Sequence, residues 1–409
     1  MQAKTITISR LTCEMQEGLV VVEGSPRLGW VMESPENGTR QSAYEIDIRE
    51  AFTGRSVWNS GKVYSTQSQL VSIEGADIRP DNQFNYSWRV RVWDETDAPS
   101  EWSREAKFRS ASSRLSEGKW IGAITRQNAH LPEGRKFHGG ELKKPEVKAA
   151  WEAVDTLAKK SICLRRTFQV GDRTEGNTNR QSGKKIVEAT AYVCGLGFYE
   201  FSLNGKKVGN SEFAPLWSDY DKTVYYNTYD VTEQLRHGEN AVGILLGNGF
   251  YNVQGGRYRK LQISFGPPTL LFELVINYED GTSTTLRSDN DWKYDFSPVT
   301  FNCIYGGEDY DARREQKGWN QVGFDDSHWR PVVIQEAPKG ILRPQMAPPV
   351  KIMERYDIQK VTKLNAEQVA SAFKSTKRTV DPSAFVLDMG QNLAGFPEIT
   401  VRGKRGQKV

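Results

Sequence analysis

The sequence of 409 residues contains little cysteine and little histidine, four of each. The cysteines are widely scattered, at Cys13, Cys163, Cys194 and Cys303. No two of them have the short spacing that zinc sites and redox pairs use, so we expect four buried thiols. The scarcity of histidine argues against most metal-dependent and histidine-dependent catalytic schemes.

Long apolar segments and a strong charge of one sign are also missing. No run of about eighteen apolar residues occurs, and Met1 to Glu17 has no apolar signal-peptide core, so we expect no membrane partner. The 55 Lys and Arg against 51 Asp and Glu leave a net charge of +4. At this length so small a charge indicates no nucleic-acid partner. The sequence leaves both cytoplasmic and periplasmic or secreted locations open.

Aromatic residues and glycine are abundant, with 11 Trp, 16 Tyr and 36 Gly. Strand patterns separated by turn residues recur from Ile6 to Ser110, and in one of them Tyr86, Trp88, Val90 and Val92 alternate with polar residues. This spacing is typical of a small β-sandwich. The fold class that the sequence predicts is all-β.

The strongest β pattern runs from Ile186 to Tyr251. Two alternating segments, 187–193 and 199–203, predict half-buried strands. Asn204-Gly205 then predicts a type I′ hairpin turn, because both residues tolerate a positive φ. The two glycine-rich pieces at 195–197 and 247–249 lack a following helix, which excludes a phosphate-binding loop.

Residues 112–161 interrupt the β pattern. Pro145 stands at a first-turn position ahead of apolar residues at helical spacing, namely Val147, Trp151, Val154 and Ala158. This segment therefore predicts a linker that contains one inserted helix, with the tryptophan in its core-facing stripe.

Four short motifs occur in order, at 192–200 (YVCGLGFYE), 203–209 (LNGKKVG), 217–220 (WSDY) and 246–251 (LGNGFY). Two more follow, at 305–315 (YGGEDYDARRE) and 324–329 (FDDSHW). As an ordered set, these motifs resemble the bacterial α-L-rhamnosidases of glycoside hydrolase family 78. Residues 86–103 also resemble the late strands of fibronectin type III modules. Residues 385–396, with a strand expected at 398–401, resemble the opening of a concanavalin-like sandwich.

The resemblance implies tandem β-sandwiches. We expect a fibronectin-III-like sandwich at 1–111, the linker with its helix at 112–161, and a galactose-binding-like jelly roll, the rhamnosidase N-terminal domain, at 162–345. Residues 346–409 would begin a concanavalin-like domain that is truncated at 409 and partly unpaired.

In the family, terminal α-L-rhamnose is hydrolysed with inversion by two acidic residues of an (α/α)6 barrel, normally on the same chain and beyond residue 409 here. The resemblance therefore implies an accessory, inactive polypeptide with no catalytic residue, which scaffolds the barrel. The alternative is a free-standing carbohydrate-binding or adhesin-like protein without hydrolase activity.

Carbohydrate binding is the function that this chain's own residues favour. Sugars need an aromatic surface for their C–H face and polar groups for their hydroxyls. Two loops offer this mixture, with Trp217, Asp219, Tyr220, Asn248, Tyr251 and Asn252. Their alternative role is structural, with Trp217 and Tyr220 in the core and Asn248 in a turn. No cofactor is required, and Ca²⁺ is an optional ligand that the resemblance suggests; the metal ligands are unknown.

A rival hypothesis places catalysis on Glu308, Asp309 and Asp311. Inverting glycosidases hold an acid and a base about 6.5–9.5 Å apart. In a strand, however, Asp309 and Asp311 share a face that Glu308 does not, and Arg313 and Arg314 keep nearby carboxylates ionised. Structural ion pairing or an inter-domain contact is the other role open to these acids.

Overall fold

The computed structural model describes residues 6–80, 84–111, 114–132, 137–171, 184–254, 261–372, 384–404 and 406–408. The chain divides into two compact units, Met1–Val350 and Lys351–Val409. Strands dominate the first unit, and the described residues hold just two α-helices, α1 (Pro145–Glu152) and α2 (Ala366–Ala372). The predicted all-β class is thus confirmed. Neither of these helices is long and apolar enough to cross a membrane.

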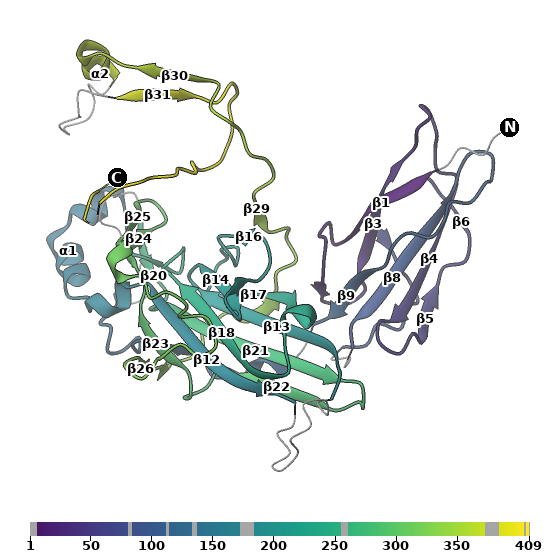
Figure 1. The fold of residues 1–409 in the computed structure, drawn as a ribbon, viewed down its shortest axis with the longest axis horizontal. Coiled ribbons are helices and arrows are strands. Elements are labelled where there is room, and N and C mark those ends of the chain that lie inside the picture. The colour runs from purple at the N-terminus through teal and green to yellow at the C-terminus, as the bar shows by residue number, and fades with distance from the viewer. Residues whose placement is uncertain are drawn as a thin grey trace. The chain divides into compact units, whose positions relative to one another are not determined.

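The first nine strands form a β-sandwich, coloured purple to blue in Figure 1. One sheet has the order β2-β9-β8-β4-β5, with β6 also on β4, and the other has the order β1-β3-β7. The predicted alternating strand is β8, whose Tyr86, Trp88, Val90 and Val92 all enter the core. The bounds are β1 (Thr7–Cys13), β2 (Val20–Val22), β3 (Arg27–Glu33), β4 (Ala43–Glu50), β5 (Ser56–Asn59), β6 (Val63–Tyr64), β7 (Val71–Ser72), β8 (Tyr86–Trp93) and β9 (Ala106–Ser110).

The central sandwich consists of two larger sheets (Figure 1). The first has the order β27-β10-β21-β13-β17-β28, with β22 on β21. Its strands are β10 (Ile121–Gly122), β13 (Ile186–Leu196), β17 (Thr223–Asp230), β21 (Thr269–Tyr278), β22 (Ser283–Arg287), β27 (Val333–Ile334) and β28 (Ile341–Pro344). The second has the order β15-β14-β18-β12-β23-β26. Its strands are β12 (Ile162–Val170), β14 (Tyr199–Leu203), β15 (Lys206–Lys207), β18 (Gly238–Leu246), β23 (Lys293–Phe296) and β26 (Arg330–Pro331).

Smaller elements surround these sheets. A three-stranded sheet joins β11 (Phe137–His138), β20 (Leu261–Ser264) and β19 (Asn252–Val253), and a hairpin joins β24 (Val299–Cys303) to β25 (Gly307–Tyr310). Two further short strands are β16 (Ser211–Glu212) and β29 (Val350–Lys351). The 3₁₀ turns are η1 (Arg114–Glu117), η2 (Gly139–Lys143), η3 (Thr156–Lys159), η4 (Thr232–Gln234) and η5 (Ala312–Arg314).

Strand β13 is buried on both faces, whereas its alternation predicted a half-buried strand. Ala189, Ala191 and Val193 face the core between the two sheets. On the opposite face Tyr192 and Cys194 pack in a second cluster, which is rich in tyrosines from later loops. The prediction was wrong because those loops fold back over the sheet.

Local signals were reliable in two places. Asn204 and Gly205 adopt φ values of +53° and +83° between the paired residues Leu203 and Lys206, which confirms the predicted hairpin turn. The predicted helix exists as α1, with Pro145 in its first turn and Val147 and Trp151 buried. It ends at Glu152, so of the expected apolar stripe Val154 follows the α-helix and Ala158 lies in the 3₁₀ turn η3, both in the same buried cluster. All four cysteines are buried free thiols, as predicted.

The second unit contains α2 and a hairpin of β30 (Lys360–Lys363) with β31 (Phe385–Asp388). The strand expected at 398–401 does not form, and these exposed residues have no assigned secondary structure. Helix α2 was not predicted, although its first turn has a capping signal. Asn365 accepts a hydrogen bond from the Gln368 backbone (2.9 Å), and Gln368 accepts one from the Asn365 backbone (2.9 Å).

A backbone contact between two glycine-rich loops closes one end of the central sandwich. The Gly247 N–H donates to the Phe198 carbonyl at 2.8 Å. A Cβ on Gly197 would lie 1.9 Å from the Gly247 carbonyl oxygen, and one on Gly249 would lie 2.7 Å from the Gly197 carbonyl carbon. Glycine is therefore needed at 197 and 249 because nothing larger than hydrogen fits.

A buried ion pair joins the N-terminal sandwich to the central one. Arg109 of β9 donates to Glu188 of β13 at 3.1 Å, and the Asn85 N–H donates to the same carboxylate at 2.9 Å. Both charged side chains are almost fully buried. Burial raises the pKa of Glu188, and Arg109 and the Asn85 N–H offset part of this effect. The pair fixes the junction because neither charge can be left alone inside the protein.

We predict that Gly197→Ala lowers the free energy of unfolding by more than about 3 kcal/mol, since the methyl group must displace backbone atoms and φ is +126°. The matched control is Gly238→Ala. Its φ of +87° is also left-handed, but nothing lies within 4 Å, so we expect a loss of about 1 kcal/mol. Urea unfolding measures both variants. Equal losses would contradict the steric argument.

We also predict that Arg109→Met costs about 3–5 kcal/mol, because it leaves the Glu188 carboxylate buried without its cation. The double variant Arg109→Met/Glu188→Met should cost less than the sum of the two single variants, by at least about 1 kcal/mol in a double-mutant cycle. As a control, Lys107→Met breaks the more exposed pair with Asp230 and should cost under about 1 kcal/mol. Additive losses for the buried pair would rule out this coupling.

Candidate functional site

The structure divides the six predicted carbohydrate-binding residues among three environments. Trp217 and Asp219 lie at the surface, Tyr220 and Tyr251 line a pocket, and Asn248 and Asn252 lie in the interior. Neighbours in one loop therefore face different surroundings. The six residues do not form one site.

Trp217 belongs to an exposed group of aromatic rings. It is 63% exposed and packs on Phe250 with a centroid distance of 5.1 Å. Phe250 also contacts Phe198 (6.2 Å) and Tyr305 (6.1 Å), and Phe198 contacts Phe213 (5.5 Å). We call these five residues the aromatic platform. Trp217 is thus not a core residue, in contrast to the alternative role considered for it.

Tyr220 and Tyr251 form the floor of a cavity of about 770 Å³, together with Phe265. The rings of Tyr220 and Tyr251 meet edge to face at 5.1 Å, and Phe265 contacts both. Ligand pockets for small molecules have volumes of about 300–1,000 Å³ and are lined mainly by apolar and aromatic groups. This cavity has the dimensions and the floor of such a site.

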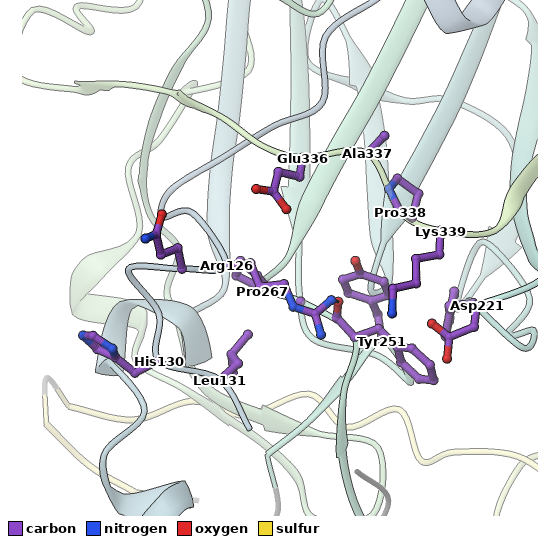
Figure 2. A pocket seen from close by; sticks show the side chains of 14 residues that line it. Arg126, His130, Leu131, Asp221, Tyr251, Pro267, Glu336, Ala337, Pro338 and Lys339 are labelled. Atoms are coloured by element: carbon purple, nitrogen blue, oxygen red, sulfur yellow. Dashed lines mark hydrogen bonds between the residues drawn. The ribbon is translucent and has the colours of Figure 1, made fainter. Parts of the chain in front are cut away.

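Charged side chains from distant segments form the rim of the pocket. Figure 2 shows Lys339 and Asp221 at one end, His130 at the other, and Arg126 pointing toward Tyr251. Arg126 donates to the Phe265 carbonyl at 2.6 Å, which fixes its guanidinium. The rim therefore offers hydrogen-bond donors and acceptors around an aromatic floor.

Burial raises the pKa of both Tyr220 and Tyr251, and for Tyr251 the nearby Arg126 opposes part of that shift. Both hydroxyls consequently stay protonated in neutral solution. The Tyr220 hydroxyl lies in the interior and has no hydrogen-bond partner among the described residues.

Asn248 and Asn252 hold the loop that carries Phe250 and Tyr251. The Asn248 amide donates to the carbonyls of Lys159 (3.0 Å) and Asn302 (3.3 Å). The Asn252 amide donates to the Ala158 carbonyl (2.8 Å) and to the Asn248 side-chain oxygen (2.9 Å). These bonds give Asn248 the turn-shaping role that was its alternative. Its amide oxygen faces another amide, so the geometry does not fit a calcium ligand.

The carboxylates Glu308, Asp309 and Asp311 lie on or next to the β24–β25 hairpin. All residues of β25 are exposed. Asp311 accepts two 2.7 Å bonds from Arg313, and these bonds hold its pKa well below the usual range. An ionised carboxylate cannot act as the general acid, which favours the structural role for Asp311.

Sequence reasoning missed most of the pocket and of the platform. Arg126, Phe265, Glu336 and Lys339 have no local signature, since only folding brings them together. Phe250 does have a local sequence signature, because it directly follows the Gly247-Asn248-Gly249 turn. Within the described part of the chain, no three His, Cys, Asp or Glu residues gather where they could hold a metal ion.

Three family models match the chain. The bacterial α-L-rhamnosidase N-terminal domain matches residues 184–354, and the N-terminal immunoglobulin domain of Rha78A-like proteins matches residues 8–113. The bacterial α-L-rhamnosidase concanavalin-like domain matches residues 378–409. The immunoglobulin match agrees with the predicted sandwich, since fibronectin type III and immunoglobulin domains share that architecture.

The curated relatives are longer than this chain. An α-L-rhamnosidase of Formosa agariphila is 34% identical, and the match covers 96% of this chain and 38% of that protein. An α-L-rhamnosidase of Streptomyces avermitilis is 28% identical, and the match covers 97% of this chain and 50% of that protein. Two solved structures are also similar. The Streptomyces avermitilis enzyme complexed with L-rhamnose has 25% identity and a TM-score of 0.67 over 88% of this chain and 48% of its own. The Aspergillus terreus enzyme has 26% identity and a TM-score of 0.68 over 95% and 39%. The chain thus spans about 38–50% of the length of its curated relatives, and its domains are similar to the N-terminal domains of bacterial α-L-rhamnosidases.

Proposed function

We propose that this chain is the non-catalytic N-terminal part of an α-L-rhamnosidase that hydrolyses terminal α-L-rhamnose from glycosides with inversion. The observation that supports this proposal is that the chain matches an N-terminal rhamnosidase domain and spans only 38–50% of the length of its curated relatives. The two catalytic acidic residues would lie in an (α/α)6 barrel on the same polypeptide. The β-sandwiches of this chain would act as a scaffold for that barrel.

The chemistry of the described residues supports an accessory role. An (α/α)6 barrel is built from long helices, and the two described α-helices have eight and seven residues. The acidic residues of the β24–β25 hairpin are exposed, and Asp311 is tied to Arg313. The ion-paired carboxylate of Asp311 is a poor proton donor because the cation of Arg313 stabilises its charge.

The second part of the proposal is carbohydrate binding by the central sandwich. The pocket above Tyr220 and Tyr251 combines an aromatic floor with Arg126 and Lys339, which suits a sugar ring and its hydroxyls. We propose a rhamnose-containing glycan as its ligand, since a related enzyme was solved with L-rhamnose. No metal ion is needed for these contacts.

A free-standing carbohydrate-binding or adhesin-like protein is the alternative. It would share the pocket but would have no hydrolytic partner. Finding hydrolysis in the polypeptide that holds these domains together with a barrel would decide against it.

This chain alone should not hydrolyse an aryl α-L-rhamnoside above the buffer rate. Release of the aryl group, followed by absorbance, measures this directly. If hydrolysis occurs and falls at least about tenfold in Asp311→Asn or Glu308→Gln, the catalytic hypothesis for these acids is right and our proposal is wrong.

Calorimetric titration should give L-rhamnose binding with a Kd of about 1 mM, or about −4 kcal/mol. Arg126→Met should weaken the binding by about tenfold, because a donor at the rim is lost. The matched control is Arg104→Met, an exposed arginine of the N-terminal sandwich, which should bind as the parent does.

Chelation by EDTA and addition of Ca²⁺ should leave this affinity unchanged. A Kd that tightens at least about tenfold with Ca²⁺ would show that the metal is a ligand of the site. Unchanged binding in Arg126→Met would exclude the pocket as the binding site.

A further inference from the structure

The aromatic platform joins three exposed rings and two half-buried rings at the surface of the first unit. It brings together Phe198, Phe213, Trp217, Phe250 and Tyr305 from four separate loops. Phe213 is 50% exposed and Tyr305 is 39% exposed, in addition to Trp217 at 63%. Large side chains exposed side by side are unusual on a folded surface and indicate an interaction site.

Contacts between the rings fix their orientation. Phe250 lies at the centre and touches three of the other four rings, while the interior hydrogen bonds of Asn248 hold its loop in place. The Trp217 ring is tilted by 30° relative to Phe250, so one side of the indole rests on Phe250 and most of the remaining surface faces solvent. A rigid surface loses little conformational entropy when it binds a ligand.

The backbone at Phe213 is itself strained. Its φ is +52°, in the left-handed region that residues with a bulky side chain rarely adopt. Such conformations persist where the surrounding structure imposes them, and they gather at functional sites. Here the strained residue contributes an exposed ring to the platform.

The composition of the platform favours a saccharide over a protein partner. All five members are aromatic, and flat rings match the C–H faces of sugar units. Two acidic side chains beside the platform in sequence are ion-paired, Glu212 with Lys207 at 3.0 Å and Asp219 with Lys222 at 3.0 Å. The loops that supply Trp217 and Phe250 also supply Tyr220 and Tyr251 to the sugar pocket.

We propose that the aromatic platform is a second carbohydrate site, which stacks against successive units of a neutral saccharide chain. The idea rests on the carbohydrate-binding role proposed above but uses different residues and a longer ligand. Several rings side by side can each contact one sugar unit, so affinity should rise with chain length and should not depend on Ca²⁺.

Affinity electrophoresis of the complete chain in gels containing soluble rhamnan tests the proposal, with dextran as the comparison polysaccharide. The parent protein should be retarded by rhamnan. Trp217→Ala and Trp217→Leu should each weaken retardation at least tenfold, because leucine is apolar but has no flat face. Trp217→Phe keeps a ring and should retain most of the binding, which also guards against misfolding of the other variants.

Tyr64→Ala is the matched control, since Tyr64 is an exposed aromatic of the N-terminal sandwich and should leave retardation unchanged. Absence of retardation by rhamnan in the parent, or full retardation of Trp217→Leu, would overturn the proposal. Self-association in the ultracentrifuge that Trp217→Ala abolishes would overturn it too, by assigning the platform to a second copy of this chain. The L-rhamnose titration and Arg126→Met test the pocket, whereas the electrophoresis and the Trp217 variants test the platform. Each proposal can therefore fail without the other.

Discussion

The close approach of two backbones at Gly197, Gly247 and Gly249 is the constraint on which the site depends. A methyl group on residue 197 would clash with the Gly247 carbonyl, and a methyl group on residue 249 would clash with the backbone of Gly197. The loops meet without side chains between them and are joined by the bond from Gly247 to Phe198. The glycines act through sterics, which is consistent with the exclusion of a phosphate-binding role.

This contact places adjacent residues on opposite sides of one loop. Phe250 turns toward the aromatic platform, whereas Tyr251 turns toward the pocket. The same division occurs between Trp217 and Tyr220 in the neighbouring loop. Below them, Asn248 and Asn252 satisfy buried carbonyls, so the polar groups that hold the loops are separate from those that would meet a ligand.

Features with a local cause could be predicted from the sequence. The Asn204-Gly205 turn and the start of helix α1 at Pro145 follow from backbone preferences of a few residues. The alternation in β8 was equally clear. The predicted strand at 398–401 failed, because a strand needs a partner and the described residues offer none there.

The site itself was only partly predictable. Aromatic residues in the right loops were recognised, but the environments of Trp217 and Tyr220 differ although they are three positions apart. Burial of β13 on both faces and the meeting of Arg126 with Lys339 arise from contacts between segments far apart in the chain. Such contacts leave no pattern within any one segment, and so single-sequence reasoning could not supply them.

We propose that this chain recognises carbohydrate through the loops organised by the glycine contact and performs no chemistry itself. Hydrogen–deuterium exchange of the chain with and without soluble rhamnan tests it most directly, since bound sugar slows the opening of the backbone it touches. We expect added protection in the segments at 213–221 and 247–254. Protection confined to the β24–β25 hairpin with its acidic residues, or no change anywhere, would contradict it.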